Sequence, residues 1–189
     1  IAGTSLDVAR SIAVDSSGNI YVAGTFRSAT LTFNNGKTLT KSGTTSNIYI
    51  AKYNMSGVCQ WAEKIYGTNE DYANSIAVDG SGNVYIAGNW MGSSTLTFNN
   101  NKTLSNTTTY YDAFIAKYNS SGVCQWAVKI AGSLSDNAKS IAVDGSGNVY
   151  VAGNWMGSST LSFNNNKTLS NTTTNEDAFI AKYNSSGTC

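Results

Sequence analysis

The sequence predicts an all-β fold: three β-propeller blades, each made of four antiparallel strands plus an extra hairpin. The stretch IAVDGSGNVYIAGNW at 76–90 returns almost unchanged at 141–155, and a looser copy occupies 12–26. The repeat period is 64 or 65 residues, and no segment has the apolar period of a helix. Such repeats bury their apolar faces against their neighbours, which favours blades stacked face to face.

Within the second copy, four segments have the pattern of strands: 75–79, 83–90, 112–119 and 123–130. Apolar residues occupy both faces of these segments, so we expect each sheet to be covered on both sides. The loop DGSGN joins the first two segments, and its Asp, Gly and Asn residues suit the backbone of a tight turn.

The polar stretch TLTFNNNKTLSNTTT at 95–109 predicts the extra hairpin. A type I′ turn needs a positive φ at both central residues, and Asn and Gly tolerate this best. We therefore expect such turns at Asn100-Asn101 and at the matching pairs Asn35-Gly36 and Asn165-Asn166.

Three stretches, SIAVDGSGNVYIAG, DAFIAKYNSSG and VCQWAVKIAGS, resemble the SBBP family of bacterial β-propeller repeats. The resemblance extends over essentially the whole chain, three times. It implies a β-propeller fold in a secreted or cell-surface bacterial protein, often a large one with several domains.

We divide the chain into three blade repeats. The first repeat covers 1–57, and its residues 1–3 match the end of a preceding fourth strand. The second repeat covers 58–122 and begins with the fourth strand of blade 1. The third repeat covers 123–189; it begins with the fourth strand of blade 2, and its own fourth strand is truncated. Three blades are too few for a closed ring, because propellers have about 4 to 8. The chain is either a window from a longer propeller or one of several copies that complete a ring, with a neighbouring chain supplying the absent strand.

Composition narrows the choice of partners. The net charge is +1, only 12% of residues are charged, and histidine is absent. We expect no nucleic-acid binding, no membrane insertion, no metal and no cofactor, and no enzymatic activity. The expected partners are copies of the chain itself or the rest of a longer chain, with surface glycans as a further candidate.

Three cysteines, Cys59, Cys124 and Cys189, occupy equivalent places early in the fourth strand of each blade. Equivalent positions in neighbouring blades are too far apart for a disulfide within the chain. Each cysteine is either a small buried apolar residue beside Trp61 or Trp126, or a candidate for an intermolecular disulfide.

Aspartates recur in two positions. Asp15, Asp79 and Asp144 begin D-x-S-G-N turns, and each loop has a single carboxylate, too few for a Ca²⁺ site. We expect them to accept hydrogen bonds from their own turn. Asp7, Asp71 and Asp136 precede the first strand with constant spacing, which favours a repeated structural lock.

Two functional hypotheses follow. Near-identical repeats favour a non-enzymatic extracellular scaffold, an adhesion module or a self-assembling surface or fibre component. The alternative is a lectin-like propeller, in which the aromatic and amide side chains at the end of the second strand bind a sugar. These candidate ligand residues are Asn89, Trp90, Asn154 and Trp155.

Overall fold

The computed structural model describes residues 1–157, 160–170 and 172–189. This part of the chain is all-β, with antiparallel sheets and no helix, as predicted. It therefore contains no helix that could cross a membrane.

Three sheets form the blades, and each runs in strand order across one repeat. Blade 1 consists of β1 (Asp7–Val14), β2 (Ile20–Phe26), β5 (Asn47–Tyr53) and β6 (Cys59–Ile65). Blade 2 consists of β7 (Asp71–Val78), β8 (Val84–Met91), β11 (Tyr111–Tyr118) and β12 (Cys124–Ile130). Blade 3 has three strands, β13 (Asp136–Val143), β14 (Val149–Met156) and β17 (Glu176–Tyr183).

The predicted strands agree with the observed ones to within one residue at most ends. The main difference is that β7 begins at Asp71, whereas we predicted a start at 75. The reason is a β-bulge between Ala73 and Ser75, across which the polar residues Asp71 and Tyr72 continue to pair with β8.

The extra hairpin is present in every blade. Its strand pairs are β3 (Thr30–Thr32) with β4 (Thr38–Thr40), β9 (Thr95–Thr97) with β10 (Thr103–Ser105), and β15 (Thr160–Ser162) with β16 (Thr168–Ser170). Asn100 and Asn101 have φ values of 57° and 54°, and the third blade matches them. The prediction of two positive φ angles is wrong for the Asn35-Gly36 turn of blade 1, where Gly36 has a positive φ and Asn35 does not. The Gly36 N–H there donates to the Phe33 carbonyl, so glycine alone supplies the left-handed residue.

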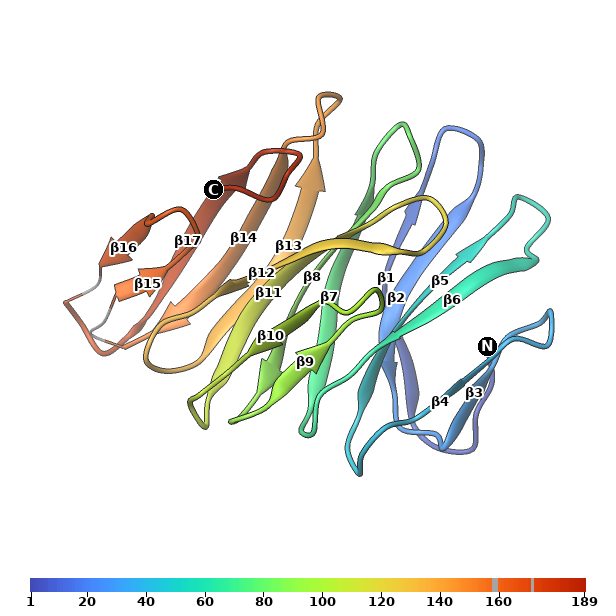
Figure 1. Cartoon of the computed structure of the whole chain (residues 1–189), viewed down its shortest axis with the longest axis horizontal. Helices are drawn as coiled ribbons and strands as arrows, with labels where there is room; N and C mark the ends of the chain where they lie inside the picture. Colours follow the sequence, from blue (N-terminus) through green and yellow to red (C-terminus); the bar gives the residue numbers. More distant parts are fainter. Residues whose placement is uncertain (158–159, 171) are drawn as a thin grey trace.

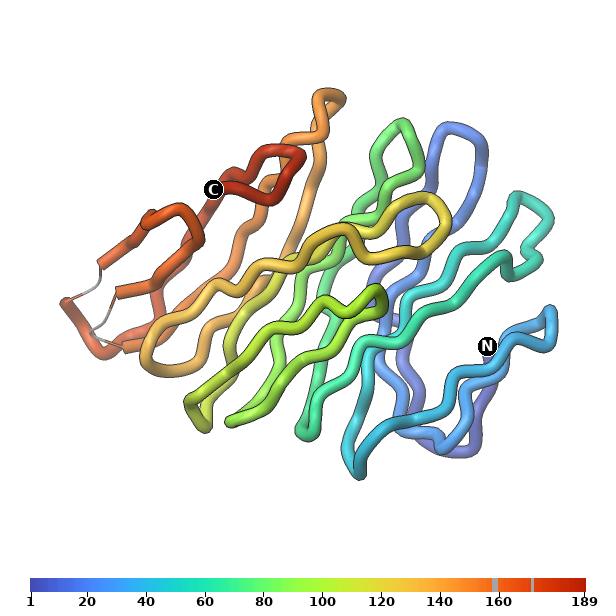
Figure 2. Tube along the Cα trace, viewed as in Figure 1, coloured from blue at the N-terminus to red at the C-terminus, as the bar shows by residue number. Residues whose placement is uncertain are grey.

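The blades lie face to face in a row, with the two chain termini toward opposite ends (Figures 1 and 2). One apolar core joins blades 1 and 2, where Tyr21 and Ile50 of blade 1 pack with Ile76 and Trp90 of blade 2. A second core joins blades 2 and 3 in the same manner. The third lies in blade 1 beneath its own hairpin. Each hairpin covers the blade face that meets the preceding blade. Both joints therefore consist of the strands of two neighbouring blades and the hairpin of the second blade.

Candidate functional site

The predicted sugar platform of Trp90 and Trp155 is not at the surface. Trp90 is 0% exposed and Trp155 is 5% exposed. The Trp90 indole N–H points inward and donates to the Ser94 carbonyl at 3.4 Å. A buried ring cannot stack on a sugar, so the prediction is wrong for these two residues.

The extra hairpin is the physical reason for this burial. It folds back over its own blade and places Leu96 and Phe98 in the same core as Trp90. The Trp90 ring meets Phe114 edge-on with centroids 6.2 Å apart, and Phe98 meets the same Phe114 ring at 5.7 Å. Phe26 and Tyr49 form the equivalent pair in blade 1. The tryptophan thus anchors the hairpin.

The two predicted amides bind other parts of the protein. Asn89 is buried, and its carbonyl oxygen accepts a hydrogen bond from Asn74 Nδ2 at 2.8 Å. The same Asn74 amide donates across the joint to the Ala138 carbonyl of blade 3. Asn154 lies in a more open place and donates to Glu176. The structure therefore does not assemble Asn89, Trp90, Asn154 and Trp155 into a ligand site.

The three cysteines differ in how far they are exposed to solvent. Cys59 and Cys124 are buried and free, and burial raises the pKa of the Cys124 thiol to about 12. An intermolecular disulfide at these two positions is contradicted, because neither thiol can reach another chain from inside a folded blade. Cys189 is partly exposed, and for it the disulfide stays a prediction.

The D-x-S-G-N turns are closed by their own aspartates, as predicted. The backbone N–H groups of Ser81 and Asn83 both donate to Asp79 Oδ1 at 2.9 Å. The Asn83 amide and the Tyr85 hydroxyl donate to Asp79 Oδ2. Partial burial raises the pKa of Asp79, but these hydrogen bonds outweigh it and lower the pKa overall. Asp15 and Asp144 have the same partners in their turns.

Two members of the second set of aspartates are fully buried, whereas Asp7 is only partly buried. Asp71 and Asp136 are 0% exposed and accept one backbone hydrogen bond each, from Gly67 and Gly132. Their other oxygens, Oδ1 in both cases, have no partner in the described part of the chain. Burial raises the pKa of both carboxyl groups to about 7. They are structural locks, as predicted, and burial keeps them protonated to a higher pH than an exposed aspartate.

The outer faces of the first and third blades are uncovered. Ile12 in β1 is 65% exposed, whereas the equivalent Ile76 and Ile141 are each 6% exposed inside joints. Ile180 in β17 is 79% exposed, whereas its equivalent Ile115 is fully buried. Tyr150 also faces solvent where its counterpart Tyr85 is buried. Both faces therefore present side chains that are buried elsewhere in the same molecule.

Each internal joint is fastened by the same two hydrogen bonds. The Ile76 N–H donates to Ser11 Oγ at 3.2 Å, and Ile141 does the same to Ser75 Oγ. Trp61 of blade 1 reaches across to blade 2, where its indole N–H donates to the Ser120 carbonyl at 3.0 Å. The Trp61 ring lies against Gly122, whereas at the equivalent Gly57 of blade 1 nothing lies within 4 Å of the place where a side chain would begin.

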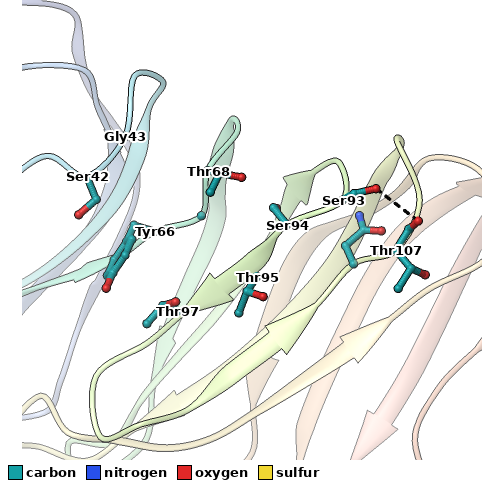
Figure 3. Close-up of a pocket in the computed structure, with 11 residues that line it drawn as sticks. Ser42, Gly43, Tyr66, Thr68, Ser93, Ser94, Thr95, Thr97 and Thr107 are labelled. Carbon is teal, nitrogen blue, oxygen red and sulfur yellow. Dashed lines mark hydrogen bonds between the residues drawn. The ribbon is translucent and has the colours of Figure 1, made fainter.

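A groove of about 740 Å³ runs along the rim between the hairpins of blades 1 and 2 (Figure 3). Tyr66 lies between Ser42 of blade 1 and Thr97 of blade 2 (Figure 3). A second hollow of about 450 Å³ shares Tyr66 and Thr97 with the first and adds Glu63 and Lys64. Tyr66 is therefore the central side chain of an extended groove.

Sequence reasoning missed Tyr66, although a signal was present. The residues equivalent to Tyr66 are Ala2 and Ala131, so this is a place where the repeats differ. A comparison of the repeats identifies the residues that they share, whereas a site that occurs only once lies at positions where the repeats differ.

Comparison with known proteins agrees with the fold. The model of the SBBP beta-propeller repeat matches residues 1–25, 64–89 and 125–154. The uncharacterized WD repeat-containing protein L264 of Acanthamoeba polyphaga mimivirus is 28% identical in an alignment of 215 residues in length. The alignment covers 97% of this chain. The regulatory protein FlaEY of Caulobacter vibrioides is 28% identical over 108 residues, or 57% of this chain.

The chain spans only 15% of the mimivirus protein and 11% of the Caulobacter protein. The three family matches fall at equivalent places, since each covers most of the first two strands of a blade, and the second and third matches also include the end of the preceding fourth strand. Matches and strands coincide in all three blades, so the SBBP beta-propeller repeat matches the same part of each blade.

Proposed function

We propose that this chain is a non-enzymatic scaffold module that joins further blades of its own kind through its two uncovered end faces. The observation that carries the proposal is the contrast between equivalent isoleucines. Ile12 and Ile180 are exposed, whereas Ile76 and Ile115 are buried inside joints. Exposed apolar faces of this kind favour association.

A second copy of the chain fits both faces, because each face has its partner surface elsewhere in the same molecule. The back face of blade 2 already receives β13, and the back face of blade 3 presents the same residue types to solvent. The joint hydrogen bond from Ile76 N–H to Ser11 Oγ would recur between Ile12 N–H of one copy and Ser140 Oγ of another. Assembly would thus proceed head to tail, which closes a ring or extends a filament.

We also propose that this scaffold works outside the cell or on the cell surface. Few charged residues, many Ser, Thr and Asn residues and the SBBP repeats support an extracellular or cell-surface setting. Near-identical repeats support a non-catalytic role, since an enzyme needs at least one asymmetric site of reacting groups.

Head-to-tail pairing can be tested with two variants that each spoil one face. We expect the unmodified chain to form assemblies whose mass grows with concentration, as measured by native mass spectrometry or light scattering. Ile12→Asp and Ile180→Asp should each be monomeric alone, because a charge at the centre of an apolar joint is costly to desolvate. An equimolar mixture of the two should form a dimer, since each variant retains the face that the other lacks.

Tyr110→Asp is the matched control, because Tyr110 is exposed on a rim loop and not on an end face. It should assemble like the unmodified chain. A chain that stays monomeric at every concentration, or a mixture that fails to pair, would contradict assembly through second copies.

A further inference from the structure

We propose that the rim groove between blades 1 and 2 binds a neutral oligosaccharide, with the ring of Tyr66 as its stacking platform. This site is separate from the end faces and does not depend on assembly of the chain. It also differs from the sugar site predicted at Trp90 and Trp155, both of which are buried.

The lining of the larger hollow favours a neutral, hydroxyl-rich ligand. All 11 lining residues are uncharged, and most carry a hydroxyl group, an amide group or an open backbone. Hydroxyl and amide groups both donate and accept hydrogen bonds, as sugar hydroxyls do. One aromatic side chain supplies an apolar surface for the C–H face of a sugar ring. The volume lies within the range of about 300–1,000 Å³ that is usual for small-ligand sites.

The Tyr66 side chain is not required by the joint that it occupies. The Tyr66 backbone pairs with Thr97, N–H to carbonyl in both directions, at 3.1 and 2.8 Å. Ala2 pairs with Thr32, and Ala131 with Ser162, in the same way with no aromatic ring. The Tyr66 hydroxyl also has no hydrogen bond to any residue that the structure describes. An aromatic ring with neither role is available to a ligand.

Lys64 determines which side of Tyr66 is available. Its ammonium lies 4.5 Å from the centroid of the ring and donates to the Thr40 carbonyl and to Ser42 Oγ, both at 2.7 Å. Lys64 lines the smaller hollow and not the larger one. The Lys64 ammonium is therefore already paired with two protein oxygens, and no charged residue lines the larger hollow, which favours a neutral ligand over an anionic one.

The experiment measures binding to the full chain by isothermal titration calorimetry and saturation-transfer NMR. The probes are cellopentaose, chitopentaose, maltopentaose and mannopentaose, each at up to about 10 mM. We expect at least one probe to bind saturably. Tyr66→Ala should weaken that binding by about threefold to tenfold, because the stacking surface is lost, and Tyr66→Phe should retain it to within about twofold.

Tyr66→Ala should fold normally, since Ala2 and Ala131 occupy the same position in the other repeats. A thermal melt checks this directly. Tyr110→Ala removes an exposed tyrosine outside the groove and should leave binding unchanged. The proposal is overturned if no probe binds, if Tyr66→Ala binds as tightly as the unmodified chain, or if a charged oligosaccharide or a peptide competes more strongly than every neutral probe.

Discussion

Aspartates close together in this sequence have opposite ionisation behaviour, and only their surroundings differ. Asp79 accepts four hydrogen bonds at a partly open turn, which stabilise its charged form and lower its pKa. Asp71 lies at the buried start of β7 with one backbone donor, and burial raises its pKa to about 7. The blades thus combine turns that need a carboxylate with joints that prefer the protonated acid.

This contrast predicts that stability falls as the pH rises from about 4 to about 7. Across that range the unfolded chain releases the protons of Asp71 and Asp136, whereas the folded chain retains them. A shift from the ordinary value of 3.8 to about 7 corresponds to at most about 4 kcal/mol for each group. The turn aspartates act in the opposite direction, and their contribution is lost only as the pH falls below about 4.

Urea-unfolding midpoints at pH 5 and pH 8 measure the effect. The unmodified chain should be less stable at pH 8, and the double variant Asp71→Asn with Asp136→Asn should show a much flatter dependence. Equal slopes for the two proteins would mean that these carboxyl groups ionise normally in the fold.

At the scale of the element, a single asparagine side chain attaches the extra hairpin to the rest of the blade by hydrogen bonds to the backbone. Asn99 Oδ1 accepts from the Cys124 N–H at 2.8 Å, and Asn99 Nδ2 donates to the Gly122 carbonyl at 2.7 Å. Asn34 and Asn164 make the same two bonds in the other blades. One side chain therefore ties the hairpin tip to the turn before the fourth strand.

Replacing Asn99 with alanine should cost about 1–3 kcal/mol of unfolding free energy, because the buried Cys124 N–H loses its partner. The loss should be local at first, with faster hydrogen exchange at the tip of the β9–β10 hairpin than in β8. Thr103→Ala, at an exposed position of β10, is the control and should change stability by less than about 0.5 kcal/mol. Unchanged exchange at the tip in Asn99→Ala would show that the side chain does not hold the hairpin.

Local pattern was sufficient to predict the strands and the hairpin, but not where the hairpin packs. Alternating apolar residues indicated β8, and paired asparagines indicated the turn at Asn100-Asn101. The position of Trp90 at a strand end also suited an exposed platform. Its burial depends on the hairpin folding back over the blade, a contact between segments that no local pattern encodes. Tyr66 was missed for a similar reason, since its groove forms only where two hairpins meet.

At the scale of the whole molecule, we expect the proposed association to use the same kind of surface that stabilises the fold. The face of β7 is buried against blade 1, and the corresponding face of β1 is open to solvent. A repeat protein of this kind is stabilised by the interfaces between neighbouring units as well as by each unit. Equivalent residues should therefore contribute to folding when they lie inside the row and to assembly when they lie at its end.

The same substitution at two equivalent positions separates these roles. Ile76→Asp places a charge in the joint between blades 1 and 2 and should lower the unfolding free energy by about 3–5 kcal/mol or prevent folding. Ile12→Asp, on the open face, should change the unfolding free energy of the dilute chain by less than about 0.5 kcal/mol while weakening association. Chemical denaturation at low and high protein concentration measures both effects. Equal loss of stability at low concentration would mean that Ile12 is already covered by its own chain, and the end face would then have no surface left for a second copy.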